Sequence, residues 1–524
     1  MNSKLKKFFS NPQGKCAAIL GASLLLLGSC AEGYESPDGF DAGVRNTQLV
    51  TPPSDSIRFE VNPAGDKATI SWPLVVGAKN YEVTFKNVDD PANPFIVDGL
   101  ENYLVDGSSV TVSVTEDSKY ELSMRVIADE SKGNKSDSVI VTSLTTLVPS
   151  IMTIPSGSDI AQYIAENPID SSYMGKEVAI DLEANGEYTL SGPVNFHGQK
   201  MTFRGDKIYR PVVKMTGAGA LYGYSMVKVK YINFDFAEST AKSFFFVSNE
   251  NLPDSLKGSN MPKYSGPKFQ KGNYMLEEPF YFAHCWFKDM PGSIFHDNQV
   301  KCAIWYLTIS DCIVQLNRGT DTPSRGYGEQ AFISLEKGGA AIKHLVIEES
   351  TIFNIKDHGA YFLRYANNSN AQAVKAFGQA DASYSTITTD FRNTTFSRVF
   401  SGGKWWNNTS GNGQITTVDH CVFHNMSPGQ IARRITGTKT YKFNFWQGEG
   451  TDHSGYKDSY GAPFAALYDD IFLGTFDQSL DFTQPNGGVN FTPNQYVVVE
   501  NRGGDPRWLP EVSAETDENT TPVE

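Results

Sequence analysis

The segment AIWYLTISDCIVQL (residues 303–316) sets the pattern that decides the fold. Its first half, Ala303 to Ile309, alternates in the way that is typical of a strand with one buried face. The polar Asp311 and the small Cys312 then precede a second apolar run. This order predicts two short strands joined by a tight turn.

The same frame recurs along the chain at irregular spacing, and a polar residue precedes each copy. A unit that repeats and grows by loop insertion is typical of a solenoid, because one coil cannot bury its own apolar face. We therefore expect Cys285, Cys312 and Cys421 to pack inside the solenoid, while the pairing of Cys302 stays open. The aligned copies are Cys285-Trp286-Phe287, Cys312-Ile313-Val314, Thr351-Ile352-Phe353, Thr394-Thr395-Phe396 and Cys421-Val422-Phe423, with an earlier one at Tyr231-Ile232-Asn233-Phe234.

Residues 55–148 contain short alternating strands separated by turn clusters. About seven strands in such a length favour a β-sandwich. Residues 149–170 contain the one clear helix signal, with Ser158 or Asp159 as its cap and Pro168 as its stop. We expect this helix to cap the first coil of the solenoid.

Composition limits the function. The 524 residues include 45 Lys and Arg against 59 Asp and Glu, a formal net charge of −14. Such an acidic chain is a poor general nucleic-acid binder, because phosphate binding needs a dense basic surface. One locally basic groove for an acidic glycan remains compatible with this charge.

The first 29 residues have the pattern of a signal peptide, with four lysines, no acid and an apolar run that is too short to span a bilayer. The run ends at Leu27-Gly28-Ser29-Cys30, which resembles the lipobox of bacterial lipoproteins; a plain signal peptide with a chance cysteine is the alternative. Cys30 would carry the lipid. Glu32 and Glu35 resemble the export signal of Bacteroidetes surface lipoproteins, which implies an outer-membrane anchor facing the cell exterior.

The sandwich resembles a fibronectin type III domain, on the placement of Trp72, Tyr81 and Tyr120. Together, these patterns divide the chain into five regions. The predicted regions are a lipoprotein signal peptide (1–29), a lipidated tether (30–54), the sandwich (55–148), the solenoid with its capping helix (149–510) and a disordered tail (511–524).

The solenoid resembles the pectin-lyase-like right-handed parallel β-helix. The resemblance rests on Gly186-Glu187-Tyr188-Thr189-Leu190 and Met201-Thr202-Phe203-Arg204-Gly205-Asp206 as first coils, and on Gly504-Asp505-Pro506-Arg507-Trp508 as the closing segment. More narrowly, the chain is similar to Bacteroidetes surface lipoproteins of polysaccharide utilisation. That resemblance implies an all-β protein that captures or degrades a polysaccharide, in company with an outer-membrane glycan importer.

A polysaccharide lyase is one reading of the polar residues. β-Elimination needs a base and a cation to stabilise the enolate. The resemblance implies an arginine or lysine base and Ca²⁺ as the cation, with Arg364, Arg398 and His358 as the candidates. His296-Asp297-Asn298 would be a source of Ca²⁺ ligands. The characteristic pectate lyase motifs are missing, and solvated arginines at coil ends are the alternative.

A glycoside hydrolase would need two carboxylates about 5–10 Å apart. Asp469-Asp470 is present, but the other motifs of β-helical polygalacturonases are missing.

Binding without chemistry is the favoured reading, with the lyase as the alternative. Trp405-Trp406 lies in a predicted loop between coils, where aromatic rings stack on sugars. Packing of these rings over the solenoid is the other possibility. Trp446, Tyr456 and Tyr460 form a second aromatic set. The basic residues that would hold an acidic sugar are Lys404, Arg318 and Arg433, and we expect Arg318, Arg364, Arg398 and Arg433 to line one face.

Overall fold

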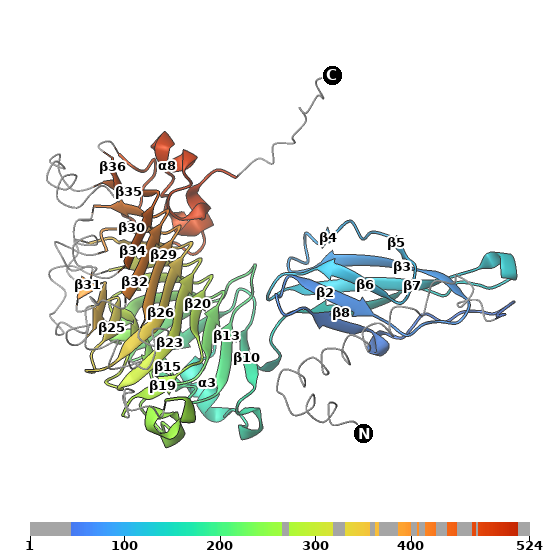
Figure 1. The fold of residues 1–524 in the computed structure, drawn as a ribbon, viewed down its shortest axis with the longest axis horizontal. Helices are drawn as coiled ribbons and strands as arrows, with labels where there is room; N and C mark the ends of the chain where they lie inside the picture. Colours follow the sequence, from blue (N-terminus) through green and yellow to red (C-terminus); the bar gives the residue numbers. More distant parts are fainter. Residues whose placement is uncertain are drawn as a thin grey trace, which may run out of the picture. The chain divides into compact units, whose positions relative to one another are not determined.

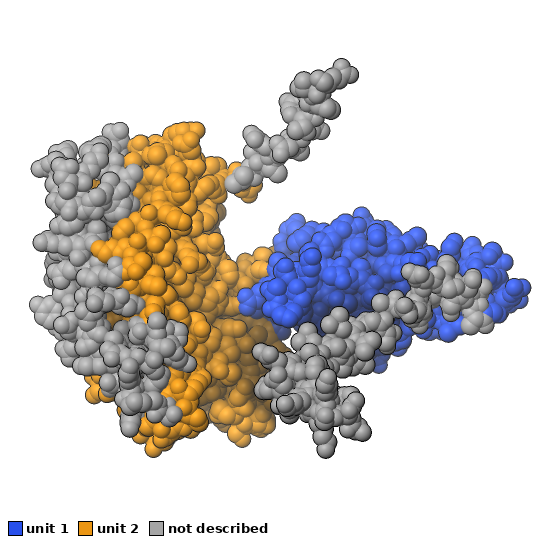
Figure 2. Space-filling model, in the orientation of Figure 1, with its two compact units in different colours: residues 1–147 blue, residues 148–524 orange. Residues whose placement is uncertain are grey.

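A computed structural model of the chain describes residues 43–264, 272–317, 331–356, 362–365, 386–399, 406–407, 414–425, 438–447, 464–467 and 470–511. The chain divides into two compact units, residues 1–147 and residues 148–524, which Figure 2 colours separately. Each unit has its own hydrophobic core.

The first unit is a β-sandwich. One sheet has the strand order β1-β2-β6 and the other β4-β3-β7-β8, with β5 also pairing with β3, and all pairs are antiparallel. The sandwich predicted from the sequence is confirmed, and its membership of the fibronectin type III family stays a prediction. The strands are β1 (Arg58–Val61), β2 (Lys67–Ser71), β3 (Ala78–Asn87), β4 (Phe95–Ile96), β5 (Tyr103–Val105), β6 (Ser109–Ser113), β7 (Lys119–Ala128) and β8 (Ile140–Thr145).

Trp72, Tyr81 and Tyr120 hold this sandwich together. Trp72 packs edge-on against Tyr81, with ring centroids 5.3 Å apart. The hydroxyl of Tyr81 accepts a hydrogen bond from the backbone N–H of Val75, and the hydroxyl of Tyr120 accepts one from Thr115. Both buried phenols are thus satisfied by turns at the sandwich edge.

The second unit is a right-handed parallel β-helix, as the sequence predicted. Each coil runs from sheet 1 to sheet 2 to sheet 3 and then enters the next strand of sheet 1 (Figure 1). Successive coils pair in parallel through all three sheets. Sheet 1 contains β9 (Ser150–Ile154), β10 (Glu177–Leu182), β13 (Lys200–Arg204), β16 (Val227–Lys230), β20 (Phe280–Ala283), β23 (Cys302–Ser310), β26 (Ala341–Glu348), β29 (Ile387–Arg392), β32 (Gln414–Asp419) and β34 (Thr438–Lys442), with β19 (Tyr274–Leu276) paired to β23.

The other two sheets complete the coils. Sheet 2 contains β11 (Glu187–Leu190), β14 (Val212–Gly217), β17 (Asn233–Ser239), β21 (Trp286–Met290), β24 (Ile313–Leu316), β27 (Thr351–Asn354), β30 (Thr395–Ser397), β33 (Val422–His424), β35 (Asn444–Gln447) and β36 (Phe464–Ala466). Sheet 3 contains β12 (Pro193–Asn195), β15 (Ala220–Gly223), β18 (Ser243–Val247), β22 (Ser293–His296), β25 (Ile333–Leu335), β28 (Leu363–Tyr365) and β31 (Trp406–Asn407).

The turn between sheets 1 and 2 explains the repeated frame. In seven successive coils, from the turn after β16 to the turn after β34, one residue has a left-handed backbone with φ near +50°, which lets the chain change direction within a single residue. The next residue points into the core. The left-handed residues are Tyr231, His284, Asp311, Glu349, Asn393, His420 and Phe443.

The predicted frame is wrong by one residue in one copy. Ile313 pairs with Thr351, so the residue level with Cys312 is Ser350. Ser350 and Thr351 are both small and polar, and only the stacking of the coils distinguishes them. The Ser350 hydroxyl oxygen accepts the N–H of Cys312 at 3.1 Å, which ties adjacent coils together.

The cysteines are buried packing residues. Cys285, Cys302, Cys312 and Cys421 are all free thiols, which answers the open pairing of Cys302. Burial raises the pKa of Cys285 and of Cys421 to about 12, so neither is a thiolate at neutral pH.

Helix α3 (Ile160–Glu166) covers the first coils, as predicted. The Asp159 side chain caps it by accepting the N–H of Gln162, and Ile160 enters the core. No helix in the described ranges is long and apolar enough to cross a membrane. The remaining described helices are α8 (Tyr496–Glu500) and the 3-10 turns η2 (Ser54–Ser56), η3 (Glu130–Lys132), η4 (Ser171–Tyr173), η5 (Asp254–Leu256), η6 (Gly258–Asn260), η7 (Pro262–Tyr264), η8 (Pro485–Gly488) and η9 (Pro506–Trp508).

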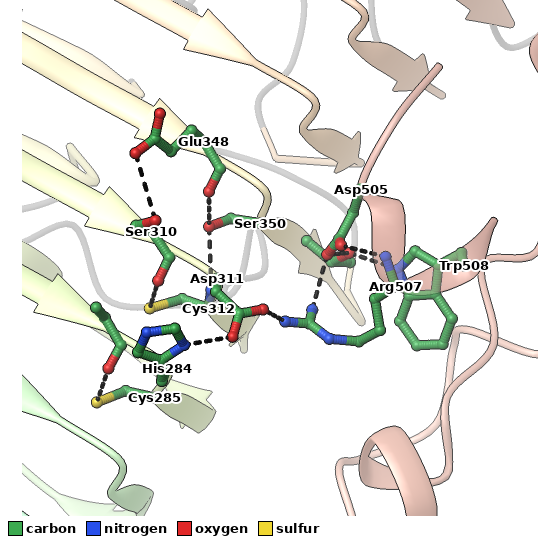
Figure 3. A network of polar contacts seen from close by, with 12 residues as sticks. His284, Cys285, Ser310, Asp311, Cys312, Glu348, Ser350, Asp505, Arg507 and Trp508 are labelled. Carbon is green, nitrogen blue, oxygen red and sulfur yellow. Dashed lines mark hydrogen bonds and ion pairs between the residues drawn. The ribbon is translucent and has the colours of Figure 1, made fainter. Parts of the chain in front are cut away.

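The C-terminal segment, residues 470–511, covers the outer face of sheet 2. Its phenylalanines and Trp508 pack on Phe353, Val422 and Phe445 of that sheet. Figure 3 shows Arg507 between Asp311 of a coil turn and Asp505 of its own segment. Asp505 and Trp508 both meet the hydroxyl of Thr351, each at 2.7 Å. The predicted closing segment therefore folds back and packs against several coils.

Candidate functional site

A row of outward side chains crosses sheet 3. Strands alternate their side chains between two faces. Leu221, Phe245, Phe295, Ile333 and Leu363 are in register and enter the core. Their successors therefore point outward. We call these the sheet 3 row: Asn195, Tyr222, Phe246, His296, Ser334 and Arg364, which are also in register.

The row is long and mostly enclosed. Five strand intervals of about 4.8 Å give it a length of about 24 Å, enough for several units of a polymer. Phe246, His296 and Ser334 at its centre are buried, while Tyr222 and Arg364 are partly exposed.

His296 at the centre of the row has one satisfied and one unsatisfied ring nitrogen. Its Nδ1 accepts the backbone N–H of Asn298 at 2.8 Å, which assigns the proton of the neutral ring to Nε2. That buried Nε2 has no hydrogen-bond partner, and its nearest carboxylate, Glu336 Oε2, lies 3.5 Å away. A buried donor without a partner is costly, so a ligand or water that accepts from Nε2 would be stabilised here.

Glu336 is the residue of this site that can accept hydrogen bonds from a ligand. Its Oε2 accepts from Gln299 Nε2 at 2.8 Å. The His296 imidazole, together with Gln299 and Arg364, holds the pKa of this carboxyl below its ordinary value. Glu336 is therefore anionic at neutral pH and can accept hydrogen bonds from hydroxyl groups.

Asp297 is a buried residue that connects the turns beside His296 and Glu336. Its carboxylate is fully buried and accepts the N–H groups of Gln299 and Lys337 at 3.1 and 2.6 Å. Burial raises its pKa. Asp297 thus joins the turn after β22 to the turn after β25, which carries Glu336. Its oxygens are used inside the protein, and within the described residues no group of three His, Cys, Asp or Glu side chains could hold a metal ion. The Ca²⁺ ligands expected at His296-Asp297-Asn298 stay a prediction.

The aromatic part of the row stacks on itself. The rings of Tyr222 and Phe246 lie 4.9 Å apart at 14°, and Phe246 meets His296 at 5.3 Å and 52°. Because the rings face one another along the helix axis, they present edges to a ligand. At the end of the row, Asn195 Nδ2 donates to Ser248 and Glu250. The surface consequently recognises polar groups by hydrogen bonds more than sugar faces by stacking.

Arg364 and Arg398 do not share a face, contrary to the sequence prediction. Arg364 lies in β28 on the sheet 3 row. Arg398 follows β30 of sheet 2 with a left-handed backbone, and its guanidinium carbon lies 5.4 Å from the ring centre of Phe476. It packs on the C-terminal segment because the chain bends there toward that cover.

Several predicted site residues lie outside the described part of the chain. Trp406 begins β31 of sheet 3, and its side chain is not described. Trp446 is buried in the core, so its assignment to a ligand-binding loop is wrong. The predicted residues outside the described ranges are Cys30, Arg318, His358, Lys404, Trp405, Arg433, Tyr456, Tyr460 and Asp469.

Tyr222, Phe246 and Glu336 were missed by sequence reasoning. The strands of sheet 3 are short and follow turns of varying length, so their register is hidden in the sequence. The available signal was a polar or aromatic residue directly after an apolar core position, as in Phe295-His296 and Ile333-Ser334.

Two family models match adjacent parts of the chain. Residues 3–185 match a family described as a domain of unknown function (DUF4992), and residues 186–355 match a second one (DUF4957). No curated protein matches the chain. Among solved structures, a family 28 exopolygalacturonase of Yersinia enterocolitica is similar at 10% identity and a TM-score of 0.17, covering 77% of this chain and 87% of that one.

Proposed function

We propose that the sheet 3 row binds a polysaccharide that carries carboxylate groups. The observation that supports this most is the buried Nε2 of His296, which makes no hydrogen bond and lies 3.5 Å from Glu336 Oε2. Arg364 lies two strands further along the row, and Glu336 lies between them in the chain. Two donors and one anionic acceptor suit a chain with both carboxylates and hydroxyls.

The protonation of His296 favours binding over catalysis. A general base needs a free lone pair directed at the substrate. The lone pair of His296 is used by Asn298, so the nitrogen that faces the row is a donor. Hydrolysis would need a second carboxylate beside Glu336, and the nearby Asp297 is occupied by backbone groups. The lyase remains the alternative that the experiment tests.

Substitution of Arg364 or His296 tests this proposal. Arg364→Ala is expected to weaken binding of polygalacturonate about 10- to 100-fold, the loss typical of a hydrogen bond to a charged group. His296→Phe keeps the ring shape and is expected to weaken binding about tenfold. The measurement is retardation in affinity gels, confirmed by calorimetry.

Arg392→Ala is the matched control, because Arg392 is an exposed arginine of sheet 1 that pairs with Asp390. The affinity of Arg392→Ala for polygalacturonate should equal that of the parent protein. Equal losses in all three variants would contradict the assignment of the site to the row. Unsaturated products released from polygalacturonate, with or without Ca²⁺, and lost in Arg364→Ala, would replace the binding function with a lyase.

We also propose that the protein is lipid-anchored through Cys30 at the outer membrane and delivers glycan to an importer. The proposal is supported by the leader and the cysteine that follows it. In cells that process lipoproteins, Cys30→Ser is expected to move the protein from the membrane fraction to the soluble fraction. Residues 1–29 should stay uncleaved at their usual site. Unchanged membrane association of the variant would contradict a lipid anchor.

A further inference from the structure

Arg210 carries a guanidinium whose charge interacts with those of Asp311 and Arg507. No hydrogen bond or ion pair involves its guanidinium within the described ranges, and its buried Nη1 has no partner. Burial lowers its pKa, while the charge of Asp311 opposes this effect and the like charge of Arg507 adds to it. The nearby Asp311 is already bonded to His284 and Arg507 through its two oxygens.

Trp286 holds the guanidinium in place. The guanidinium carbon of Arg210 lies 5.3 Å from the ring centre of Trp286. Trp286 is half-buried on the outer face of sheet 2, with Phe482 of the C-terminal segment beside it. A guanidinium held over an indole ring is pre-oriented, which favours bidentate binding of a carboxylate.

Asn233 adds an unpartnered acceptor beside the cation. It lies in register between Val212 and Trp286, and its backbone N–H donates to Pro211, the residue after Arg210. Since Trp286 is two coils from Arg210, the arginine side chain extends past Asn233 to reach the ring. The Asn233 side chain is buried, and its Oδ1 has no hydrogen-bond partner.

From these observations we infer that Arg210, Asn233 and Trp286 form a second ligand site, on sheet 2, for a carboxylate that bears a neighbouring hydroxyl group. The carboxylate accepts from Arg210, and the hydroxyl donates to Asn233 Oδ1. A free sugar acid and a uronate unit within a chain share this chemistry. The site lies on a different sheet from the row and does not depend on the function proposed for it.

The test is ¹⁹F NMR of the full chain labelled with 5-fluorotryptophan. The Trp286 resonance is identified by its loss in Trp286→Phe. D-galacturonate is expected to shift this resonance, and D-galactose, which lacks the carboxylate, is expected to leave it in place. Repeating the titration with polygalacturonate distinguishes a free acid from a unit in a chain.

Two variants separate the site from a general folding defect. Arg210→Gln is expected to weaken galacturonate binding about tenfold or more. Asn233→Asp keeps the size of the side chain and places a carboxylate beside Arg210. It is expected to abolish binding while leaving or raising the thermal stability, so a loss through unfolding would be recognised.

Arg364→Ala should leave the Trp286 shift unchanged, because Arg364 belongs to the sheet 3 row. If the sheet 3 row proves not to bind polysaccharide, the inference about the sheet 2 site is unaffected. If the sheet 2 site proves not to bind, the proposal for the row is unaffected. The inference is overturned if galacturonate does not move the Trp286 resonance or if galactose moves it equally. It is also overturned if folded Arg210→Gln binds as the parent protein does.

Discussion

Replacing Phe287 with alanine is expected to lower the free energy of unfolding of the β-helix by about 3–5 kcal/mol, the cost of truncating a buried phenylalanine. Phe287 is fully buried. It stacks on Phe234 at 5.3 Å and meets Phe244 edge-on at 5.1 Å. Its removal would leave a cavity between rigid strands on both sides, which cannot collapse to fill it.

Tyr306→Ala is the control for this prediction. Tyr306 is an exposed ring of sheet 1 in the same unit, stacked on His344. Its loss should cost less than about 1.5 kcal/mol, the range of an aromatic pair. Denaturant unfolding followed by circular dichroism measures both. Similar costs for the two variants would contradict the prediction that the buried ring of Phe287 contributes strongly to stability.

The second prediction concerns pH and the C-terminal segment. His424 Nδ1 and the Ser397 hydroxyl share a hydrogen bond of 2.8 Å, and the ring lies between Phe472 and Phe476 of that segment. Burial, with the nearby Arg398 charge, lowers its pKa to about 3. Asp505 of the segment is also buried, and burial raises its pKa to about 6.

These two groups have opposite effects on stability. A histidine with a depressed folded pKa contributes stability above its unfolded pKa of about 6.5, and that stability is lost as the pH falls. Between pH 7 and pH 5 this loss is about 2 kcal/mol. A carboxyl with a raised folded pKa is stabilised by protonation, so Asp505 gains about 1 kcal/mol over the same interval. In the parent protein the two effects partly cancel and leave a net loss of about 1 kcal/mol.

Single variants separate the two titrations. In Asp505→Asn, acidification from pH 7 to pH 5 should loosen residues 470–511 by about 2 kcal/mol, since His424 alone remains. In His424→Asn, the same change should tighten the segment by about 1 kcal/mol. Hydrogen-exchange protection, corrected for the intrinsic pH dependence of exchange, measures both. The same pH dependence in both variants would rule out these assignments.

Much of the fold was readable from the sequence, for a physical reason. The turn between sheets 1 and 2 must be tight, so most copies have a polar residue and a small one at the same place, as in Asp311-Cys312. The predicted register was wrong at Thr351 because Ser350 satisfies the same small, polar pattern. Only hydrogen bonding between coils selects Ser350.

The site was less predictable. Arg364 was identified because a charge in an apolar segment is conspicuous, and the structure places it on the row. Glu336 was missed because its partner His296 is separated from it by a whole coil. Arg398 was misplaced because the C-terminal segment that covers it lies far away in the chain. Contacts of this kind leave no local pattern.

A crystal structure with a bound oligogalacturonide tests the central claim most directly. We predict a chain of sugar units along the sheet 3 row, with one carboxylate on Arg364 and an oxygen within hydrogen-bond distance of His296 Nε2. An oligosaccharide bound only elsewhere, with the row empty at a saturating concentration, would contradict the account.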